Sequence, residues 1–94
     1  MSKNYKLSND AKEDLRRIYA YGFNLWGVEQ ADKYFDNFFL CFNEISKQPE
    51  QYQSVDHIRK GYRRCVCGID SIYYRVKNNN VEIMNIIGSQ DYDL

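Results

Sequence analysis

The chain has few of the residues that mark specialised chemistry: one histidine, one proline, one tryptophan and three cysteines among 94 residues. With a single histidine, a metal centre is short of nitrogen ligands, and cysteine catalysis has only one candidate base. The odd number of cysteines argues against a secreted scaffold held by disulfides. The sequence therefore predicts neither a metal nor a cofactor, and it does not favour a thiol enzyme.

Long apolar runs and an excess of charge are absent as well. Without an N-terminal apolar segment or a membrane-length run, the sequence predicts a cytoplasmic protein with no membrane association. Basic and acidic residues number 13 each, so the formal net charge is zero. Residues 1–56 hold 7 basic and 9 acidic side chains, whereas residues 57–94 hold 6 and 4. This mild shift points to a positive sheet face and not to a general polyanion-binding surface.

What the chain does contain is typical of one small globular domain spanning residues 1–94. Apolar residues make up 44% and charged residues 28%, a balance that indicates a folded and not a disordered chain. A chain of this size buries roughly 60–65% of its unfolded surface, which allows one modest core.

The first half predicts a short strand, Tyr5 to Leu7, and two helices. Asp10 and Glu13 fit a capping box at the start of the first helix, and Gly27 ends it. The only proline, Pro49, ends the second helix near Lys47 or Gln48. Apolar residues recur at helical spacing in both: Leu15, Ile18, Tyr19, Gly22 and Trp26, then Ala31, Phe35, Phe38, Phe42 and Ile45, with Tyr34 and Cys41 beside them. The short connection predicts an antiparallel helical hairpin.

The second half predicts an irregular connection over residues 49–61, followed by three strands. These strands span roughly Tyr62 to Val66, Ile69 to Val76 and Val81 to Ile87. "CGID" and "KNNN" supply the turns, because Gly and Asn adopt positive φ readily. The predicted order is β-α-α-β-β-β: an α+β fold with an N-terminal helical hairpin on one face of a small, mainly antiparallel sheet.

The cysteines are best interpreted as buried or half-buried thiols. Cys65 and Cys67 would point to the same face of one strand, a poor arrangement for a relaxed bridge. Cys41 belongs to the stripe of the second helix, and His57 lies in a loop with no reason to approach any thiol.

Three arginines stand in the stretch "GYRRCVCGIDSIYYRV", and strand alternation suggests where two of them point. Ile72 is expected to meet the helices, which would leave Arg63, Tyr73 and Arg75 on an open sheet face. A solvated surface is the plain interpretation. Arginine and tyrosine are nevertheless enriched at interface hot spots, so a docking surface is the alternative.

Four stretches resemble a known family in register: "SNDAKEDLRRIYAYGFNLWG", "QADKYFDNFFLCFNEISKQP", "IRKGYRRCVCGIDSIYYRV" and "VEIMNIIGSQD". Together they cover nearly all of the chain and resemble the ParE toxins of the RelE/ParE toxin–antitoxin superfamily. One position departs from the family pattern, since Ser89 stands where ParE sequences often carry a basic residue.

The resemblance implies a type II toxin that poisons DNA gyrase, blocks replication and is neutralised by a ParD-like antitoxin. Operator DNA would be reached only indirectly, through the antitoxin, and either a homodimer or a toxin–antitoxin hetero-oligomer would form. The antitoxin is expected to use Arg63, Tyr73 and Arg75. Gyrase is expected to meet the C-terminal residues Gly88, Ser89, Gln90, Asp91 and Tyr92.

Two alternatives stay open. Relatives named RelE cleave messenger RNA on the ribosome, but such chemistry needs a general base and cations around the phosphate. Here "GSQDYDL" ends the chain with two aspartates and no base, and Tyr92 alone fits the nuclease pattern. The sequence therefore predicts no catalytic residue. If Ser89 marks a degenerate copy, the chain would instead be a non-toxic antitoxin-binding module.

Overall fold

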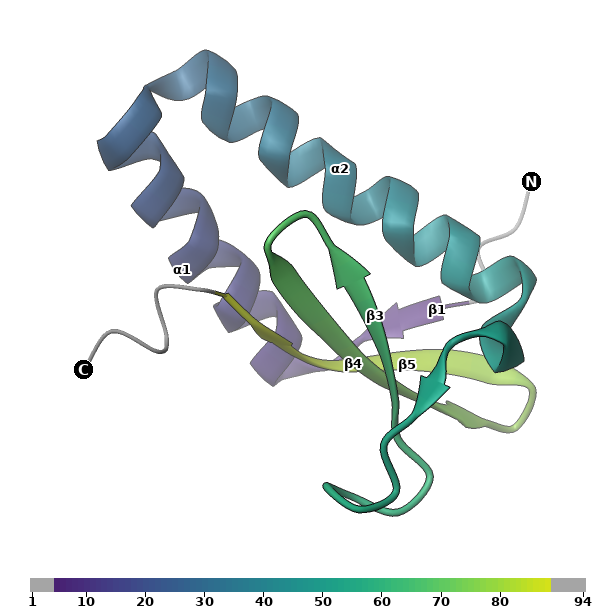
Figure 1. Cartoon of the computed structure of the whole chain (residues 1–94). Coiled ribbons are helices and arrows are strands. Elements are labelled where there is room, and N and C mark those ends of the chain that lie inside the picture. Colours follow the sequence, from purple (N-terminus) through teal and green to yellow (C-terminus); the bar gives the residue numbers. More distant parts are fainter. Residues whose placement is uncertain (1–4, 89–94) are drawn as a thin grey trace.

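Two helices lie across one face of a five-stranded sheet in the computed structural model, which describes residues 5–88 (Figure 1). The elements are β1 (Tyr5–Leu7), α1 (Asn9–Trp26), α2 (Val28–Lys47), a 3₁₀ turn (Pro49–Gln51), β2 (Gln53–Ser54), β3 (Arg63–Cys67), β4 (Asp70–Lys77) and β5 (Asn80–Ile87). The strand order is β1-β5-β4-β3-β2, and only the β1–β5 pair is parallel. The predicted α+β fold is confirmed, except that β2 lies in the segment expected to be irregular.

The helical hairpin forms where the periodicity predicts it. Ser8 caps α1 by accepting a hydrogen bond from the Ala11 amide at 3.0 Å, so the cap lies two residues before Asp10 and the capping box expected at Asp10 and Glu13 is wrong. Gly27 separates the helices with φ +88°, a conformation that costs glycine no Cβ clash and permits the immediate reversal. The second helix ends at Lys47, before Pro49, as expected.

The core lies between the hairpin and the sheet. Both predicted stripes supply it, although Trp26 is 49% exposed and lies outside it. The largest fully buried apolar side chains are Tyr74, Phe38, Phe42, Ile45, Ile72, Ile83 and Ile86. The Tyr74 hydroxyl donates a hydrogen bond to the Pro49 carbonyl, which satisfies the one polar group of this large buried ring.

The strand turns confirm the turn chemistry read from the sequence. Gly68, Asn78 and Asn79 all have positive φ, at 64°, 54° and 64°. An added Cβ at Gly68 would lie 3.2 Å from the Tyr34 ring and hydroxyl, so a larger residue would be strained by the positive φ and would also crowd Tyr34.

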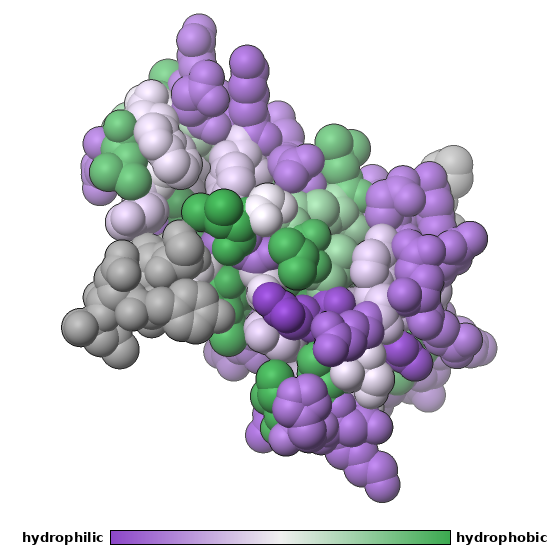
Figure 2. Space-filling view, viewed as in Figure 1, coloured by the Kyte–Doolittle hydropathy of each residue, from purple (hydrophilic) through white to green (hydrophobic). Residues whose placement is uncertain are grey.

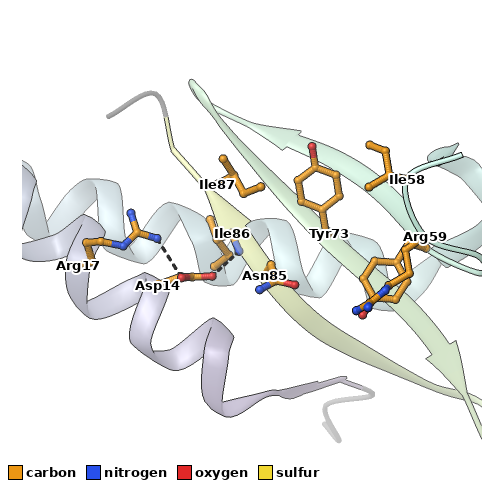
Figure 3. Close-up of a pocket in the computed structure, with 9 residues that line it drawn as sticks. Asp14, Arg17, Ile58, Arg59, Tyr73, Asn85, Ile86 and Ile87 are labelled. Atoms are coloured by element: carbon orange, nitrogen blue, oxygen red, sulfur yellow. Dashed lines mark hydrogen bonds and ion pairs between the residues drawn. The ribbon is translucent and has the colours of Figure 1, made fainter. Parts of the chain in front are cut away.

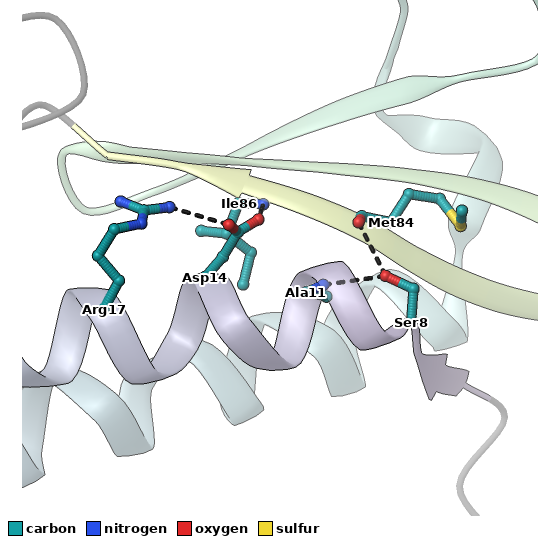
Figure 4. A network of polar contacts seen from close by, with 6 residues as sticks. All are labelled: Ser8, Ala11, Asp14, Arg17, Met84 and Ile86. Carbon is teal, nitrogen blue, oxygen red and sulfur yellow. Dashed lines mark hydrogen bonds and ion pairs between the residues drawn. The ribbon is translucent and has the colours of Figure 1, made fainter.

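One edge of the sheet is closed by a helix (Figure 4). Strand β1 pairs with residues 81–83 of β5, and within residues 5–88 no strand pairs with the rest of that edge. Ser8 donates from its hydroxyl to the Met84 carbonyl at 2.8 Å, and Asp14 accepts from the Ile86 amide at 2.8 Å. The start of α1 thus supplies polar partners where no strand does.

The cysteine interpretation is wrong for two of the three residues. The structure joins Cys41 of α2 to Cys67 of β3 in a disulfide bond, and only Cys65 is free. The pairing was invisible in the sequence because it depends on how α2 crosses the sheet. Burial raises the pKa of the Cys65 thiol, which keeps it neutral.

Neither helix within residues 5–88 combines the length and the apolar character that a bilayer crossing requires.

Truncation of Phe42 tests the assignment of the core. Phe42→Ala should lower the free energy of unfolding by about 3–5 kcal/mol, because a fully buried ring is replaced by a cavity. Leu40→Ala is the matched control on the same helix: Leu40 is 63% exposed, and its loss should cost less than about 0.5 kcal/mol. Chemical denaturation followed by circular dichroism measures both. Wild-type stability in Phe42→Ala would mean that this stripe does not face the sheet.

Candidate functional site

The register of β3 and β4 decides which arginines share a face. Arg63 is paired with Tyr74, and Arg64 with Tyr73. Directly paired residues point to the same side of a sheet. Since Tyr74 is buried under the helices, Arg63 belongs to the helix-covered face, and Arg64 belongs with Tyr73 on the uncovered face, called here the open face. The expected placement of Arg63 on the open face is therefore wrong.

Arg63 is engaged within the fold. Its Nη1 donates a 2.7 Å hydrogen bond to the carbonyl of Tyr52, just before β2. This hydrogen bond ties the residue before β2 to β3. Burial raises the pKa of the Tyr74 hydroxyl. The nearby positive charge of Arg63 lowers this pKa, but by less than burial raises it. Arg63 is half-buried at the margin of the core.

The other two predicted residues do lie on the open face. Tyr73 is half-buried and lies opposite Asn85 of β5. Arg75 donates from Nε to Glu82 at 2.7 Å, with the side chains 39% and 20% exposed. Arg75 is thus already paired within the sheet, whereas Tyr73 presents its ring to a groove.

That groove, of about 740 Å³, runs between α1 and the open face at the end of β5 (Figure 3). Its residues come from α1, the loop before β3, and strands β4 and β5: Asp14, Arg17, Ile58, Arg59, Tyr62, Tyr73, Asn85, Ile86 and Ile87. The helix closes the groove at one side because Asp14 ties α1 to the edge of β5. The loop carrying Ile58 and Arg59 closes the other side.

The groove combines cations with apolar surface. Arg59 is exposed and stands over the Tyr62 ring, 5.7 Å from its centroid. Arg17 pairs with Asp14 at 2.9 Å. Ile58 is 60% exposed. An exposed cation on an aromatic platform beside aliphatic side chains suits a ligand that offers both carboxylates and apolar groups.

Apolar side chains continue the open face beyond the groove. Val66, on the same face as Ser71, is 60% exposed, and Ile69 in the β3–β4 turn is 65% exposed. Figure 2 shows hydrophobic side chains gathered near the middle of the visible surface with polar ones around them. Arg64 lies among these residues and donates from Nε to the Ser71 hydroxyl at 2.9 Å. An apolar centre with a polar surround is the usual anatomy of a protein interface.

Of the residues expected to contact gyrase, the structure describes only Gly88. Gly88 is the last described residue and is buried directly after β5. The expected contacts Ser89, Gln90, Asp91 and Tyr92 lie outside the described residues. Gly88 follows Ile87, which lines the groove, so the chain leaves the sheet beside that groove.

Several groove residues carry no distinctive pattern in the sequence. Arg17 and Arg59 lie far apart in the chain, and Asn85 is one polar residue in an apolar strand. One signal was available for Arg64: Cys65 and Cys67 lie on the covered face, and Arg64 alternates with them, so it points to the opposite face. Among residues 5–88, no group of three or more His, Cys, Asp or Glu side chains is placed to hold a metal ion.

Comparison with known proteins gives a consistent result. A family model described as "ParE toxin of type II toxin-antitoxin system, parDE" matches residues 5–92. Toxin ParE1 of Caulobacter vibrioides is 39% identical over 85 residues, covering 90% of this chain and 88% of the relative. Toxin ParE1 of Mycobacterium tuberculosis is 28% identical over 88 residues, covering 93% and 90%.

A solved structure shares the fold. A chain of the structure described as "Chromosomal ParDE TA system from P. aeruginosa" aligns with a TM-score of 0.80 at 23% identity, covering 90% of this chain and 94% of that one. This likeness confirms the arrangement of a helical hairpin on a mixed sheet.

The pKa of Glu82 shows whether Arg75 donates its hydrogen bond to Glu82 when no partner is bound. Its hydrogen bond from Arg75 lowers the pKa of Glu82 below the ordinary 4.5, helped by the nearby charges of Lys77 and Lys6. Arg75→Gln should therefore raise the pKa of Glu82, as seen by carboxyl-carbon NMR titration. Because the folded pKa is depressed, the pair's contribution to stability is present above the unfolded pKa and is lost as pH falls through the folded value. An unchanged Glu82 titration in Arg75→Gln would show that the pair does not form in solution.

Proposed function

The chain belongs to the family of ParE toxins of type II toxin–antitoxin systems, and from this membership we propose that it poisons DNA gyrase and is neutralised by a ParD-like antitoxin. The observation that carries the proposal is a family match over residues 5–92 of the 94. The groove beside the end of β5 supports it, because its chemistry suits binding. A toxin that acts on gyrase works in the cytoplasm.

The groove offers cations but no uncommitted general base. Its carboxylate, Asp14, accepts hydrogen bonds from the Ile86 amide and from Arg17. Arginines remain protonated and cannot take a proton from an RNA hydroxyl. Such a groove favours a binding toxin over a RelE-type nuclease, and we propose no catalytic residue.

The antitoxin is proposed to lie along the open face. A segment with acidic and apolar residues would set its carboxylates against Arg64 and Arg59 and its apolar groups against Tyr73, Ile58 and neighbouring aliphatic residues. Arg64 replaces Arg63 in this role, because only Arg64 shares a face with Tyr73. Arg75 contributes only if the antitoxin displaces Glu82. The toxin would then meet operator DNA only through the antitoxin, in a hetero-oligomer.

Gyrase is proposed to meet the C-terminal segment that begins at Gly88. This segment, "GSQDYDL", carries two negative charges and two large apolar groups, a composition better suited to protein than to DNA.

A gyrase assay tests the central proposal. Purified toxin, gyrase, ATP and plasmid should accumulate linear cleaved DNA, and induced expression should yield filamentous cells with an SOS response while translation continues. Cleavage of ribosome-bound messenger RNA with gyrase untouched would establish the nuclease alternative. Normal growth on induction of a folded protein would instead identify a non-toxic antitoxin-binding module.

Reversal of one open-face charge tests the antitoxin surface. Arg64→Glu should weaken binding of a ParD-like antitoxin by about 2–5 kcal/mol if the charge pair is desolvated. Lys12→Glu, an equal change of charge at an exposed position of α1, should have little effect beyond long-range attraction. Isothermal titration calorimetry measures both. Equal affinities of Arg64→Glu and wild type would remove the open face from the interface.

Removal of residues 89–94 tests the C-terminal segment. The truncated chain keeps every described element, so its thermal transition and its antitoxin affinity should match those of the full chain. It should no longer trap cleaved DNA with gyrase. Should the shortened protein poison gyrase as well as the full chain does, the gyrase contact must lie on the sheet or the helices.

A further inference from the structure

One line of α2 meets the end of the β3–β4 hairpin through polar and sulfur contacts. Tyr34 donates from its hydroxyl to buried Asp70, Asn37 donates from Nδ2 to the Cys67 sulfur at 3.4 Å, and Cys41 bonds to Cys67. Positions 34, 37 and 41 fall on one stripe of the helix. Because Cys67 and Asp70 are directly paired across the two strands, all three contacts converge on the end of this hairpin.

The two bonded cysteines are held by separate elements that meet at a suitable distance. Their Cα atoms are 6.5 Å apart, inside the range that a disulfide bridges without backbone movement. Cys41 is half-buried, whereas Cys67 and Cys65 are only 3% and 5% exposed. Solvent-borne reagents therefore reach the pair through Cys41.

We propose that Cys41 and Cys67 form a redox-responsive bond that fastens the β3–β4 hairpin to α2 and makes the stability of the folded chain depend on the thiol–disulfide balance around it. The cytoplasm keeps most thiols reduced, so we expect the bond to form only when the surroundings of the protein become more oxidising. Cys65 takes no part, because it is buried and its thiol stays protonated.

The oxidant is a low-molecular-weight disulfide such as oxidised glutathione. The Cys41 thiolate attacks one sulfur of the oxidant, forming a mixed disulfide and releasing one glutathione thiolate. The Cys67 thiolate then attacks the Cys41 sulfur, releases the second glutathione and completes the protein disulfide. Two electrons pass from the protein to the oxidant, and the two cysteine protons leave to solvent or to the departing thiolates.

The bond restricts the unfolded chain by closing a loop of 26 residues between α2 and β3. Closing a loop of that size should raise the ratio of folded to unfolded protein by roughly two orders of magnitude. For a domain of this length, that change corresponds to an increase in Tm of about 10–20 °C.

The test compares the purified full chain in oxidised glutathione and in dithiothreitol. Alkylation under denaturing conditions should label one cysteine in the oxidised protein and three in the reduced protein, and peptide mapping should join the Cys41 and Cys67 peptides. Tm should be higher in the oxidised form, and hydrogen exchange over residues 63–77 should be slower. Dithiothreitol should reverse all four differences.

Matched variants separate the pair from general thiol effects. Cys41→Ala should abolish the oxidation-dependent rise in Tm, while Cys65→Ala should retain it. Cys41→Ala is the informative variant even if Cys67→Ala fails to fold, because Cys41 is the less buried partner. Four outcomes would each overturn the proposal. The oxidised protein could still have three labelled cysteines, or its bond could involve Cys65. Its bonds could form only between molecules, or an intramolecular bond could leave Tm unchanged.

Discussion

The part of the β5 edge that no described strand covers is the constraint from which much of this architecture follows. Strand β1 is three residues long and covers only the first part of the β5 edge. Backbone groups left unpaired at a buried edge are costly, so the remaining part needs other partners. Ser8 and Asp14 provide them from the start of α1. Helix α1 must therefore run along this edge, and the groove exists because it does.

The two faces of the sheet are used differently. On the covered face, aromatic and aliphatic side chains form the core, and its polar groups are tied inward, as the Arg63 guanidinium is to the Tyr52 carbonyl. On the open face, Arg64 and Tyr73 lie beside exposed aliphatic residues, and Arg75 is held by Glu82. One face thus forms the core, and the other is the face that we propose binds the antitoxin.

Local features were predictable from the sequence because each depends on neighbouring residues. The helix stripes, the stop at Pro49 and the left-handed turns at Gly68 and Asn79 all follow from spacing and residue type. The face of Arg63 was predictable too, since it lies at strand spacing from two cysteines, Cys65 and Cys67, and so shares their face. The open-face assignment for Arg63 failed because alternation within one strand does not give the register between β3 and β4, which pairs Arg63 with buried Tyr74.

Other features depend on contacts that no local pattern records. Strand β2 has only two polar residues, and it is a strand because β3 presents an edge to it. The Cys41–Cys67 bond depends on the path of α2 over the sheet. The partner of Asp14 is a backbone amide of Ile86, a group that every residue except proline provides, so the sequence carries no mark of that contact. For the same reason, the groove residues could not be gathered from the sequence.

The parallel pairing of β1 with β5 has a consequence for synthesis of the protein. Tyr5 is paired with Val81, so within residues 5–88 the first strand, β1, pairs with the last one, β5. Until β5 leaves the ribosome, β1 is unpaired, and the apolar stripes of the hairpin lack Ile83 and Ile86. Contacts this distant in sequence are also the slowest to form. A nascent chain therefore completes this sheet only after β5 has emerged from the ribosome, which leaves an interval in which other proteins meet an incomplete sheet.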